Sequence, residues 1–227
     1  MKRSYLKNAL LIMVMILVII PCTAIAGDNK GQEIIDLQQE RGGGGNECYQ
    51  YVKNIRQTKT YNCGTTNVLQ ALYGMGYEDE VSGSTDAYKI QDIDTRYSID
   101  SQGQTYVYQI RDALNYYIPG ITSYKYTEVI TDVNDENYMS ISDFENIIAT
   151  SLTNCKPVIL HAVTSPLSYY NGHTNYHYIC IDYINRTTDT VRIVDCHYSN
   201  SYYGVHYVSL QEAYETVTIE SGRYIIH

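Results

Sequence analysis

Basic side chains are scarce in this sequence, and several patterns that would indicate a function are missing. The 227 residues hold 16 Lys and Arg against 25 Asp and Glu, and no basic cluster offsets the excess of acid. Phosphate repels a chain of this charge, which argues against nucleic acid and against an anionic membrane surface as partners. No Cys-x-x-Cys pair and no zinc-type spacing of His and Cys occurs, so a structural zinc site is not expected.

Tryptophan is absent and phenylalanine occurs once, whereas tyrosine occurs 26 times. The aromatic part of the core must therefore come largely from tyrosine, and each buried tyrosine needs a partner for its hydroxyl. A tyrosine-biased core and surface explains the composition most simply. The pairs Tyr169-Tyr170 and Tyr202-Tyr203 leave open a second interpretation, a tyrosine-lined groove for a peptide or a sugar.

The N-terminus has the pattern of a secretory signal peptide over residues 1–26. Three basic residues precede the apolar run Ala9 to Ile20, and a small-x-small site follows it. The run has 12 residues, too few for a spanning helix, which needs about 20. A lipoprotein anchor at Cys22 is disfavoured because Pro21 stands where a small residue is expected. We therefore expect a secreted or extracellular protein, which could stay associated with the cell envelope, and no membrane contact after signal cleavage.

The rest of the chain divides at a run of four glycines, Gly42 to Gly45. Such a run does not hold regular structure cheaply, so residues 27–45 are interpreted as a flexible tail or pro-segment, with self-cleavage at the glycines as a further hypothesis. Residues 46–227 suit one domain. Without the signal peptide, 13 basic residues face 25 acidic ones, a net charge of −12.

Cysteine usage indicates at least one unpaired thiol. Apart from the one in the signal peptide there are five, an odd number: Cys48, Cys63, Cys155, Cys180 and Cys196. An unpaired thiol is a liability in an oxidising compartment unless it is buried or used. The count allows one reactive thiol and at most two disulfides, whose pairing the sequence does not give.

Helical patterns come first in the chain and strand patterns second. Helices are predicted from Cys63 to Gly74 with Asn62 as cap, within 105–120, and within 140–154 with Ser140 or Ser142 as cap. Residues 77–103 resemble a long surface excursion. Strands are predicted at 157–163, 176–184, 189–196, 203–210 and 223–227, with a short helix at 209–217. This order predicts an α+β fold, with N-terminal helices packed on a C-terminal antiparallel β-sheet.

An acidic stretch invites a calcium interpretation that does not hold well. Asp132, Asn134, Glu136 and Asp143 fall at positions 1, 3, 5 and 12 of an EF-hand-like loop. Asn137 stands where that loop requires glycine, so a solvated acidic turn is favoured. No metal or other cofactor is called for, although the sequence alone does not settle metal binding in the acidic loops.

Two of the predicted strands form a hairpin with a polar end. Pairing centred on Arg186 sets three pairs opposite each other on one face: Ile181 with Val191, Ile179 with Ile193, and His177 with Asp195. Because a buried aspartate needs a partner, the His177–Asp195 pair is hard to explain by packing alone. The same register separates Cys180 from Cys196, so no disulfide between them is expected.

Cys63 is the candidate nucleophile because it precedes a helix. The helix dipole and an adjacent imidazolium both lower the pKa of a thiol. His177 would then hold the ion pair and protonate the leaving amine, while Asp195 orients the imidazole. Gln57 could donate to the oxyanion together with the Cys63 N–H, and Gly64 would leave space for the substrate backbone.

These residues resemble the C39-like branch of the papain-like cysteine peptidases. The resemblance covers most of residues 50–200 and lies in "QTKTYNCGTTNVLQAL", "HYICIDYI" and "VRIVDC". It implies a papain-like fold, with catalytic Cys63 on the first core helix, His177 on a strand, Asp195 on the next strand, and Gln57 as the oxyanion residue. The family often has Asp-Pro where this chain has Asp195-Cys196. The implied activity is hydrolysis of a peptide or protein substrate.

Other interpretations remain at this stage. Cys63 alone could be a buried or disulfide-bonded residue, and His161 and His173 compete with His177, whereas His206 and His227 lack an acidic partner. The same dyad would serve a cell-wall amidase or a transglutaminase-like acyl transferase. A catalytically silent extracellular peptide-binding domain is the non-enzymatic alternative. The substrate and the oligomeric state stay open.

Overall fold

The computed structural model describes residues 46–118 and 123–227, and the described part has five α-helices and a seven-stranded sheet. In chain order the elements are β1 (Glu47–Tyr49), α2 (Cys63–Met75), η1 (Glu78–Glu80), α3 (Asp86–Tyr97), α4 (Val107–Tyr117), β2 (Tyr126–Glu128), α5 (Ile141–Thr153), β3 (Val158–Val163), η2 (Ser168–Tyr170), β4 (Tyr176–Asn185), β5 (Thr190–Asp195), β6 (Gly204–Ser209), α6 (Leu210–Thr218) and β7 (Tyr224–Ile226). The predicted signal peptide and glycine-rich tail lie outside the described residues.

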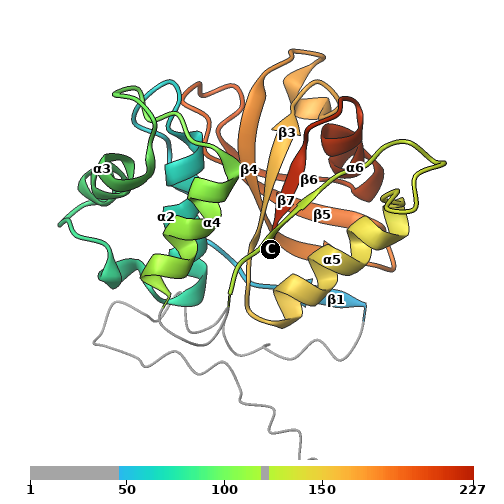
Figure 1. Cartoon of the computed structure of the whole chain (residues 1–227), viewed down its shortest axis with the longest axis horizontal. Helices are drawn as coiled ribbons and strands as arrows, with labels where there is room; N and C mark the ends of the chain where they lie inside the picture. The colour runs from blue at the N-terminus through green and yellow to red at the C-terminus, as the bar shows by residue number, and fades with distance from the viewer. Residues whose placement is uncertain (1–45, 119–122) are drawn as a thin grey trace, which may run out of the picture.

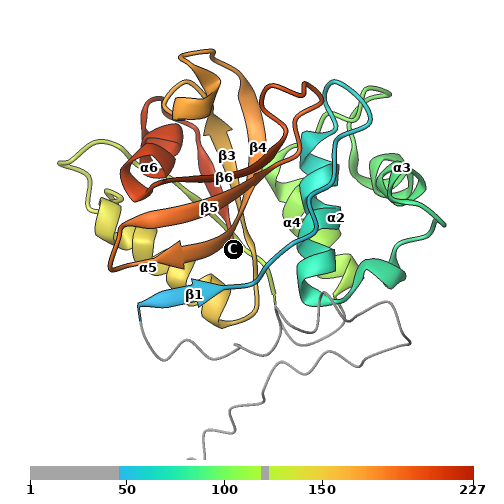
Figure 2. The ribbon, with the colours of Figure 1, turned by 180° about the vertical axis from the view of Figure 1, so that it is seen from behind.

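Helices and sheet occupy different sides of the molecule. In Figure 1, α2, α3 and α4 stand on the left, and the sheet with α5 and α6 fills the middle and right. The view from behind in Figure 2 shows the same separation. The strand order is β2-β7-β3-β4-β5-β6, every named pair is antiparallel, and β1 pairs with the end of β4 that β3 leaves free. The predicted α+β class, with helices packed on an antiparallel sheet, is confirmed.

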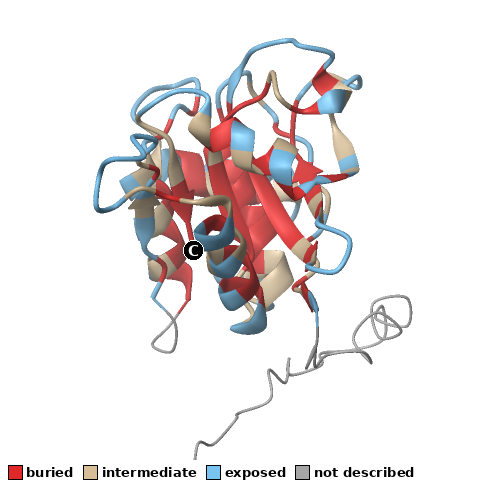
Figure 3. Cartoon of the chain, turned by 90° about the vertical axis from the view of Figure 1, so that its right-hand side faces the viewer, coloured by how far each residue is buried: buried red, intermediate tan, exposed pale blue. Residues whose placement is uncertain are grey.

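The central strands β3, β4 and β5 are buried on both faces, and their successive side chains enter two different cores. Along β3, Val158, Leu160 and Ala162 join the core beneath α5 and α6, whereas Ile159 joins the core beneath α2 and α4. In Figure 3 the central strands are largely red, and the outward parts of the helices and many loops are pale blue. Burying each large aliphatic side chain contributes roughly 1.5–3 kcal/mol, so these two cores fix how the helices lie on the sheet.

The helix ends follow the expected chemistry in part. Gly76 takes a left-handed conformation (φ +79°) after α2, as a glycine stop requires. Ser140 caps α5 in a capping box with Asp143, which confirms Ser140 rather than Ser142 as the cap. Asn62 does not cap α2 with its side chain. Asn62 is the N-cap residue, as predicted, but its amide accepts from the Lys59 N–H and donates to Asp94 instead of bonding to the helix N–H groups.

Residues 77–103 are not a surface excursion, because they contain η1 and α3. The helix was missed because Ile90 and Ile93 are its only fully buried aliphatic residues, too few for a visible apolar stripe. The strands β1 and β2 were also missed, since segments of three residues carry almost no periodicity.

The hairpin of β4 and β5 pairs in a different register from the one predicted. Ile181 lies opposite Ile193 rather than Val191, and a bulge at Asp182 shifts the pairing before the turn. The prediction failed because it assumed a turn centred on Arg186 and no bulge. A bulge adds one residue to one strand and changes which side chains share a face. The shifted register still brings His177 and Asp195 within hydrogen-bond distance.

Candidate active site

Cys63 begins α2 and lies where the helical side meets the sheet. The loop that leads to it is held on the sheet, because the Gln57 N–H donates to the Cys196 carbonyl at 2.8 Å. Cys63 is 9% exposed, so its thiol is mostly buried yet not sealed from solvent. The first N–H groups of a helix have no partner within the helix, which leaves the N-terminus of α2 beside this thiol with partial positive charge.

His177 on β4 is bonded to Asp195 at the end of β5. The distance from His177 Nε2 to Asp195 Oδ1 is 2.9 Å, and both side chains are buried. Because Nε2 is engaged by the carboxylate, Nδ1 is the ring nitrogen left for the thiol. The structure therefore confirms the contact between two of the predicted residues, although they are not directly opposite in the ladder.

Four donors converge on the Asp195 carboxylate. Oδ1 accepts from His177 and from the His197 backbone N–H at 2.8 Å. Oδ2 accepts from the hydroxyls of Tyr169 at 3.1 Å and Tyr170 at 2.9 Å. A carboxylate with this many donors is stabilised in its charged form even when buried. Asp195 is thus an orienting anion with every oxygen satisfied.

The pKa shifts of these groups follow from their contacts. Burial acts to raise the pKa of Asp195, but His177, the His197 N–H and Tyr170 together lower it below its usual value. Burial acts to lower the pKa of His177, while the charges of Asp195 and Cys63 raise it well above its usual value. Burial likewise acts to raise the pKa of Cys63, and the charge of His177 and its hydrogen bond to Cys63 outweigh this and lower it. Both shifts favour a thiolate beside an imidazolium.

Gln57 is engaged with its own loop. Both hydrogens of its amide are used, since Nε2 donates to the carbonyls of Lys59 at 2.7 Å and Thr60 at 2.9 Å. The side chain is buried next to the Cys196 sulfur. In this structure Gln57 therefore holds the loop before Cys63, and one of these bonds must open before the amide can donate to an oxyanion. That role stays a prediction.

Gly64 does not leave space for a substrate, and this prediction was wrong. A Cβ at Gly64 would lie 2.0 Å from Thr105 Oγ1 and 3.0 Å from Ile110 Cδ1. The absent side chain lets the start of α4 approach α2 closely. Gly64 thus serves the packing beside the nucleophile rather than the substrate site.

Several residues around the site were not singled out by sequence analysis. Asn67, one turn after Cys63, donates through Nδ2 to the carbonyls of Cys63 and Tyr178, each at 2.8 Å, and lies 3.3 Å from the Cys196 sulfur. His197 also escaped notice, although it directly follows Asp195-Cys196 in sequence. Only its nearness to Asp195 could have indicated it.

The remaining histidines lie elsewhere. His161 on β3 stacks on Tyr178 of β4. His227 directly follows β7 and bonds to Thr127 of β2. His206 stacks flat on Tyr169, so it supports the aromatic residues around Asp195. His173, in the β3–β4 loop, lies near Tyr202. None of the four contacts Asp195 in the way that His177 does.

Cysteine pairing agrees with the odd count. Cys63, Cys180 and Cys196 are unpaired thiols, in agreement with the expectation of at least one unpaired thiol. Cys180 and Cys196, between which no disulfide was expected, are both free thiols. Burial raises the pKa of Cys196 to about 12 despite its contact with His177, so Cys63 is the thiol that ionises at this site.

The acidic stretch that invited a calcium interpretation forms local turns. Asp132 accepts from the Asn134 N–H at 2.9 Å, and Asp135 accepts from the Asn137 N–H at 2.7 Å. Over residues 46–118 and 123–227, no group of three or more His, Cys, Asp or Glu side chains is placed to hold a metal ion. Within the same ranges, no helix is both long and apolar enough to cross a membrane.

Comparison with known proteins finds a structural likeness only. No protein-family description and no curated protein matches the chain. Among solved structures, the fold is similar to that of a double glycine motif protease from an AMS/PCAT transporter, solved in complex with the leader peptide. The two share 12% sequence identity with a TM-score of 0.48, and the match covers 78% of this chain and 91% of the other. The site described above is assigned from its own geometry.

Proposed function

We propose that this protein is an exported cysteine peptidase that hydrolyses peptide bonds. Cys63 is the nucleophile, His177 the general acid and base, and Asp195 the carboxylate that orients the imidazole. The proposal rests above all on His177, which is bonded to a buried carboxylate through Nε2 and lowers the pKa of the Cys63 thiol. Cysteine, histidine and an orienting group in this order are what nucleophilic acyl transfer requires.

The reaction follows from the placement of these groups. The Cys63 thiolate adds to the carbonyl carbon of the substrate, and the π electrons of the carbonyl move to its oxygen. The His177 imidazolium gives its proton to the amine as the C–N bond breaks, which leaves a thioester on Cys63. Neutral His177 then takes a proton from water, and the resulting hydroxide releases the carboxylic acid and restores the thiolate.

Two groups are candidates for stabilising the oxyanion. The backbone N–H of Cys63 is at the start of α2, where helix N–H groups have no intrahelical partner. The Gln57 amide becomes a second donor if it leaves one of its two loop carbonyls. On this account Gln57→Glu should remove the donor, whereas Gln57→Asn would shorten the reach and retain the amide.

The central experiment is the rate of Cys63 alkylation by iodoacetamide between pH 4 and 9, with the labelled position identified by peptide mapping. We expect fast labelling of Cys63 well below pH 7 in the wild type, and a single rise near pH 8.5 in His177→Ala. Cys196→Ala is the matched control, because Cys196 also contacts His177 but has a raised pKa.

Two outcomes would contradict the proposal. Equal alkylation profiles in the wild type and His177→Ala would show that Cys63 is a structural thiol, and the silent binding domain would then take precedence. A low-pH plateau without hydrolysis of any peptide, but with acyl transfer to an added amine, would replace hydrolysis by transferase chemistry at the same dyad.

A further inference from the structure

A row of aromatic side chains crosses the sheet on the face that packs against α2, the helix of Cys63. His161 on β3 lies opposite Tyr178 on β4 and opposite Tyr224 on β7. Its ring stacks on both, with centroids 4.9 Å from Tyr178 and 6.1 Å from Tyr224. We call these three residues the aromatic row. Tyr178 follows His177 in the strand and points to the other face of the sheet, where it belongs to the same buried cluster as Cys63. The row therefore begins on the side of the nucleophile and leads away from it across the sheet.

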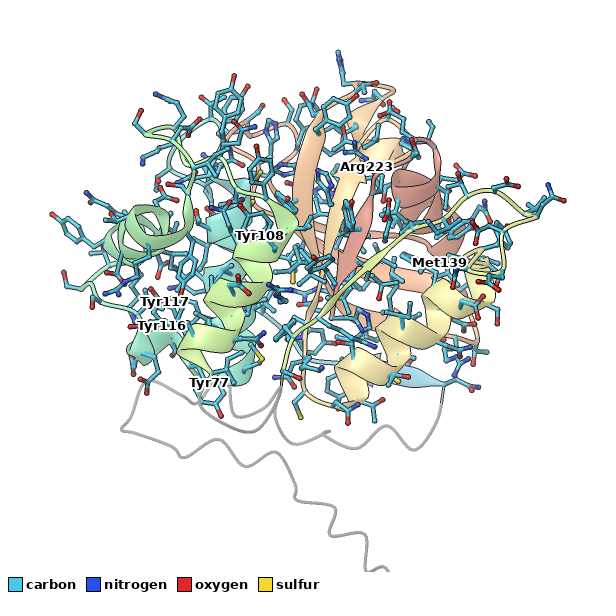
Figure 4. The ribbon with its side chains drawn as sticks, in the orientation of Figure 1. Tyr77, Tyr108, Tyr116, Tyr117, Met139 and Arg223 are labelled. Atoms are coloured by element: carbon cyan, nitrogen blue, oxygen red, sulfur yellow. The ribbon has the colours of Figure 1, made fainter. Side chains whose placement is uncertain are left out.

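Arg223 lies on this row and is held there without a carboxylate. Its guanidinium is 4.8 Å from the centre of the Tyr176 ring, and NH1 is 3.3 Å from His161 Nε2. Nε is buried and has no partner, and among the described residues no Asp or Glu forms an ion pair with Arg223. Figure 4 labels Arg223 over the sheet and Tyr108 on the neighbouring helix α4.

The other described arginines differ from Arg223 in a way that is informative. Four of them pair with carboxylates: Arg96, Arg111, Arg186 and Arg192. Arg56 stands over a tyrosine ring but is exposed to water. Arg223 alone among them is half-buried and lacks an acidic partner, in a chain where acidic residues outnumber basic ones 25 to 16. A partly buried cation is costly unless an anion or hydrogen bonds compensate it.

His161 does not provide that anion and keeps Arg223 in place. Burial and the charge of Arg223 lower the pKa of His161 to about 4, so the ring is neutral at neutral pH and accepts from the guanidinium. The contact uses one of the five N–H donors of the arginine. Stacking on Tyr176 and the bond to His161 fix the plane of the fork before any ligand arrives, which reduces the entropy lost on binding.

Tyr178 connects Arg223 with the nucleophile. Burial raises the pKa of the Tyr178 phenol, the charge of Cys63 raises it further, and Arg223 lowers it. Tyr178 shares a buried cluster with Cys63, and His161, which stacks on Tyr178, is the residue bonded to Arg223. The Tyr178 hydroxyl donates to the Thr105 carbonyl at 3.3 Å, just before α4. Thr105 in turn packs against Gly64, the residue after Cys63, so a chain of contacts joins the nucleophile to Tyr178, His161 and Arg223.

We propose that Arg223 binds a carboxylate of the substrate and so directs cleavage to peptides that carry negative charge at a fixed distance from the scissile bond. The inference rests on the proposed peptidase function. Arginine recognises carboxylates through charge-assisted and often paired hydrogen bonds. The carboxylate can come from an Asp or Glu side chain or from the C-terminus of a short peptide.

The test is cleavage of a peptide library by the purified protein, with products identified by mass spectrometry. The library is a proteome digested by an unrelated endopeptidase, used with free C-termini and again after C-terminal amidation. We compare the wild type with Arg223→Met, which retains an unbranched chain, and with Arg223→Lys, which retains the charge. Arg111→Met is the matched control, because Arg111 also stands over a tyrosine ring but is paired with Asp112.

Among the peptides cleaved by the wild type and by Arg111→Met, we expect acidic groups to be enriched at one fixed position relative to the scissile bond. Arg223→Met should lower kcat/KM for such peptides roughly 10- to 100-fold, with little change for neutral ones, and Arg223→Lys should fall between. Loss of the enrichment on amidation would assign the carboxylate to the C-terminus, and its persistence would assign it to a side chain.

The inference would be overturned if the wild type showed no enrichment of acidic groups in the cleaved peptides, or if Arg223→Met showed the same enrichment as the wild type. Either result would leave the peptidase function intact. If no library peptide is cleaved although Cys63 alkylates at low pH, the peptidase function itself fails and the assignment of Arg223 falls with it. The two failures are therefore distinguishable.

Discussion

Asp182 and Asp195 are both fully buried on neighbouring strands, and each is bonded to a basic side chain, yet they ionise differently. Burial raises the pKa of Asp182 to about 6 in spite of Arg192. The pKa of Asp195 is lowered in spite of equal burial, although its partner is a titratable histidine rather than a permanent cation.

The difference lies in how many donors each carboxylate has. Each of the two Asp195 oxygens accepts two hydrogen bonds, four in all. Oδ2 of Asp182 accepts from Arg192 and from the Val52 N–H, but Oδ1 is buried and has no partner among the described residues. Hydrogen bonds to the charged form compensate the desolvation of a buried carboxylate, and one cation does not replace a missing donor. The comparison shows that a charged partner alone does not keep a buried carboxylate ionised: Asp195 has the charge of His177 and three further donors, whereas Asp182 has Arg192 but an oxygen without a donor.

The two carboxylates also differ in what they position. Asp195 orients the ring of His177. Asp182 is the bulge residue of β4, where its backbone carbonyl accepts from Gln50 and its side chain accepts from Val52. The segment around residue 50 thus pins the bulge that sets the register of β4 on β5. One aspartate orients the site directly, and the other acts through the backbone.

The largest expected effect separates the two carboxylates by activity. Asp195→Asn should lower kcat/KM by about 10²- to 10⁴-fold, because the imidazole loses its orientation and its charge compensation. Asp182→Asn should stay within a few-fold of the wild type, since the amide oxygen can keep both bonds of Oδ2 and place the NH₂ at the partnerless position. Peptide cleavage rates measure both. Equal losses in the two variants would contradict the division of roles.

The next effect is a pH dependence of stability. The folded pKa of Asp182 lies above its unfolded value, so folding retains a proton that the unfolded chain releases. The free energy of unfolding should therefore fall as pH rises from about 4 to 6, by at most roughly 3 kcal/mol for this group. Urea unfolding at pH 4.5 and 7 measures this difference in the free energy of unfolding. The decrease should occur in the wild type and be absent in Asp182→Asn. Identical pH dependence in both would refute the raised pKa.

Removing one donor from Asp195 should have a smaller effect. Tyr170→Phe deletes a hydrogen bond to a charged group, which is worth about 1.5–3 kcal/mol, and Tyr169→Phe should cost less because its bond is longer. Both should raise the pKa of Asp195, weaken its hold on His177 and slow alkylation of Cys63 at pH 6. Tyr202→Phe is the matched control, since Tyr202 stacks on Tyr170 at 4.2 Å without bonding to Asp195. A control that slows alkylation equally would assign the effect to packing.

The smallest effect is expected at His197. Its backbone N–H is the donor to Asp195, so His197→Gln leaves that bond in place. Alkylation of Cys63 at pH 6 should change less than in Tyr170→Phe. A larger change would mean that the imidazole, whose centroid is 5.3 Å from that of His177, contributes to the site itself.

Local pattern was enough to find most of the longer elements and to place three candidate site residues on them. Cys63 was assigned to a helix start, His177 to a strand and Asp195 to the next, and each lies there. Tyr169 and Tyr170 were noted only as a cluster, because nothing in sequence connects them with a residue 25 positions later. The same limit applies to Gly64, whose neighbour Thr105 is far along the chain.

The sequence by itself determined the charge of the protein, the order of the longer helices and strands, and the helix and strand positions of the candidate residues Cys63, His177 and Asp195. These depend on backbone periods and neighbours within a few residues. Only the tertiary structure decided the register of β4 on β5, the donors that reach Asp195, the engagement of Gln57 by its own loop and the position of Arg223. The physical reason is that register and hydrogen-bond satisfaction depend on residues distant in the chain, as in the bond from Val52 to Asp182 across 130 positions.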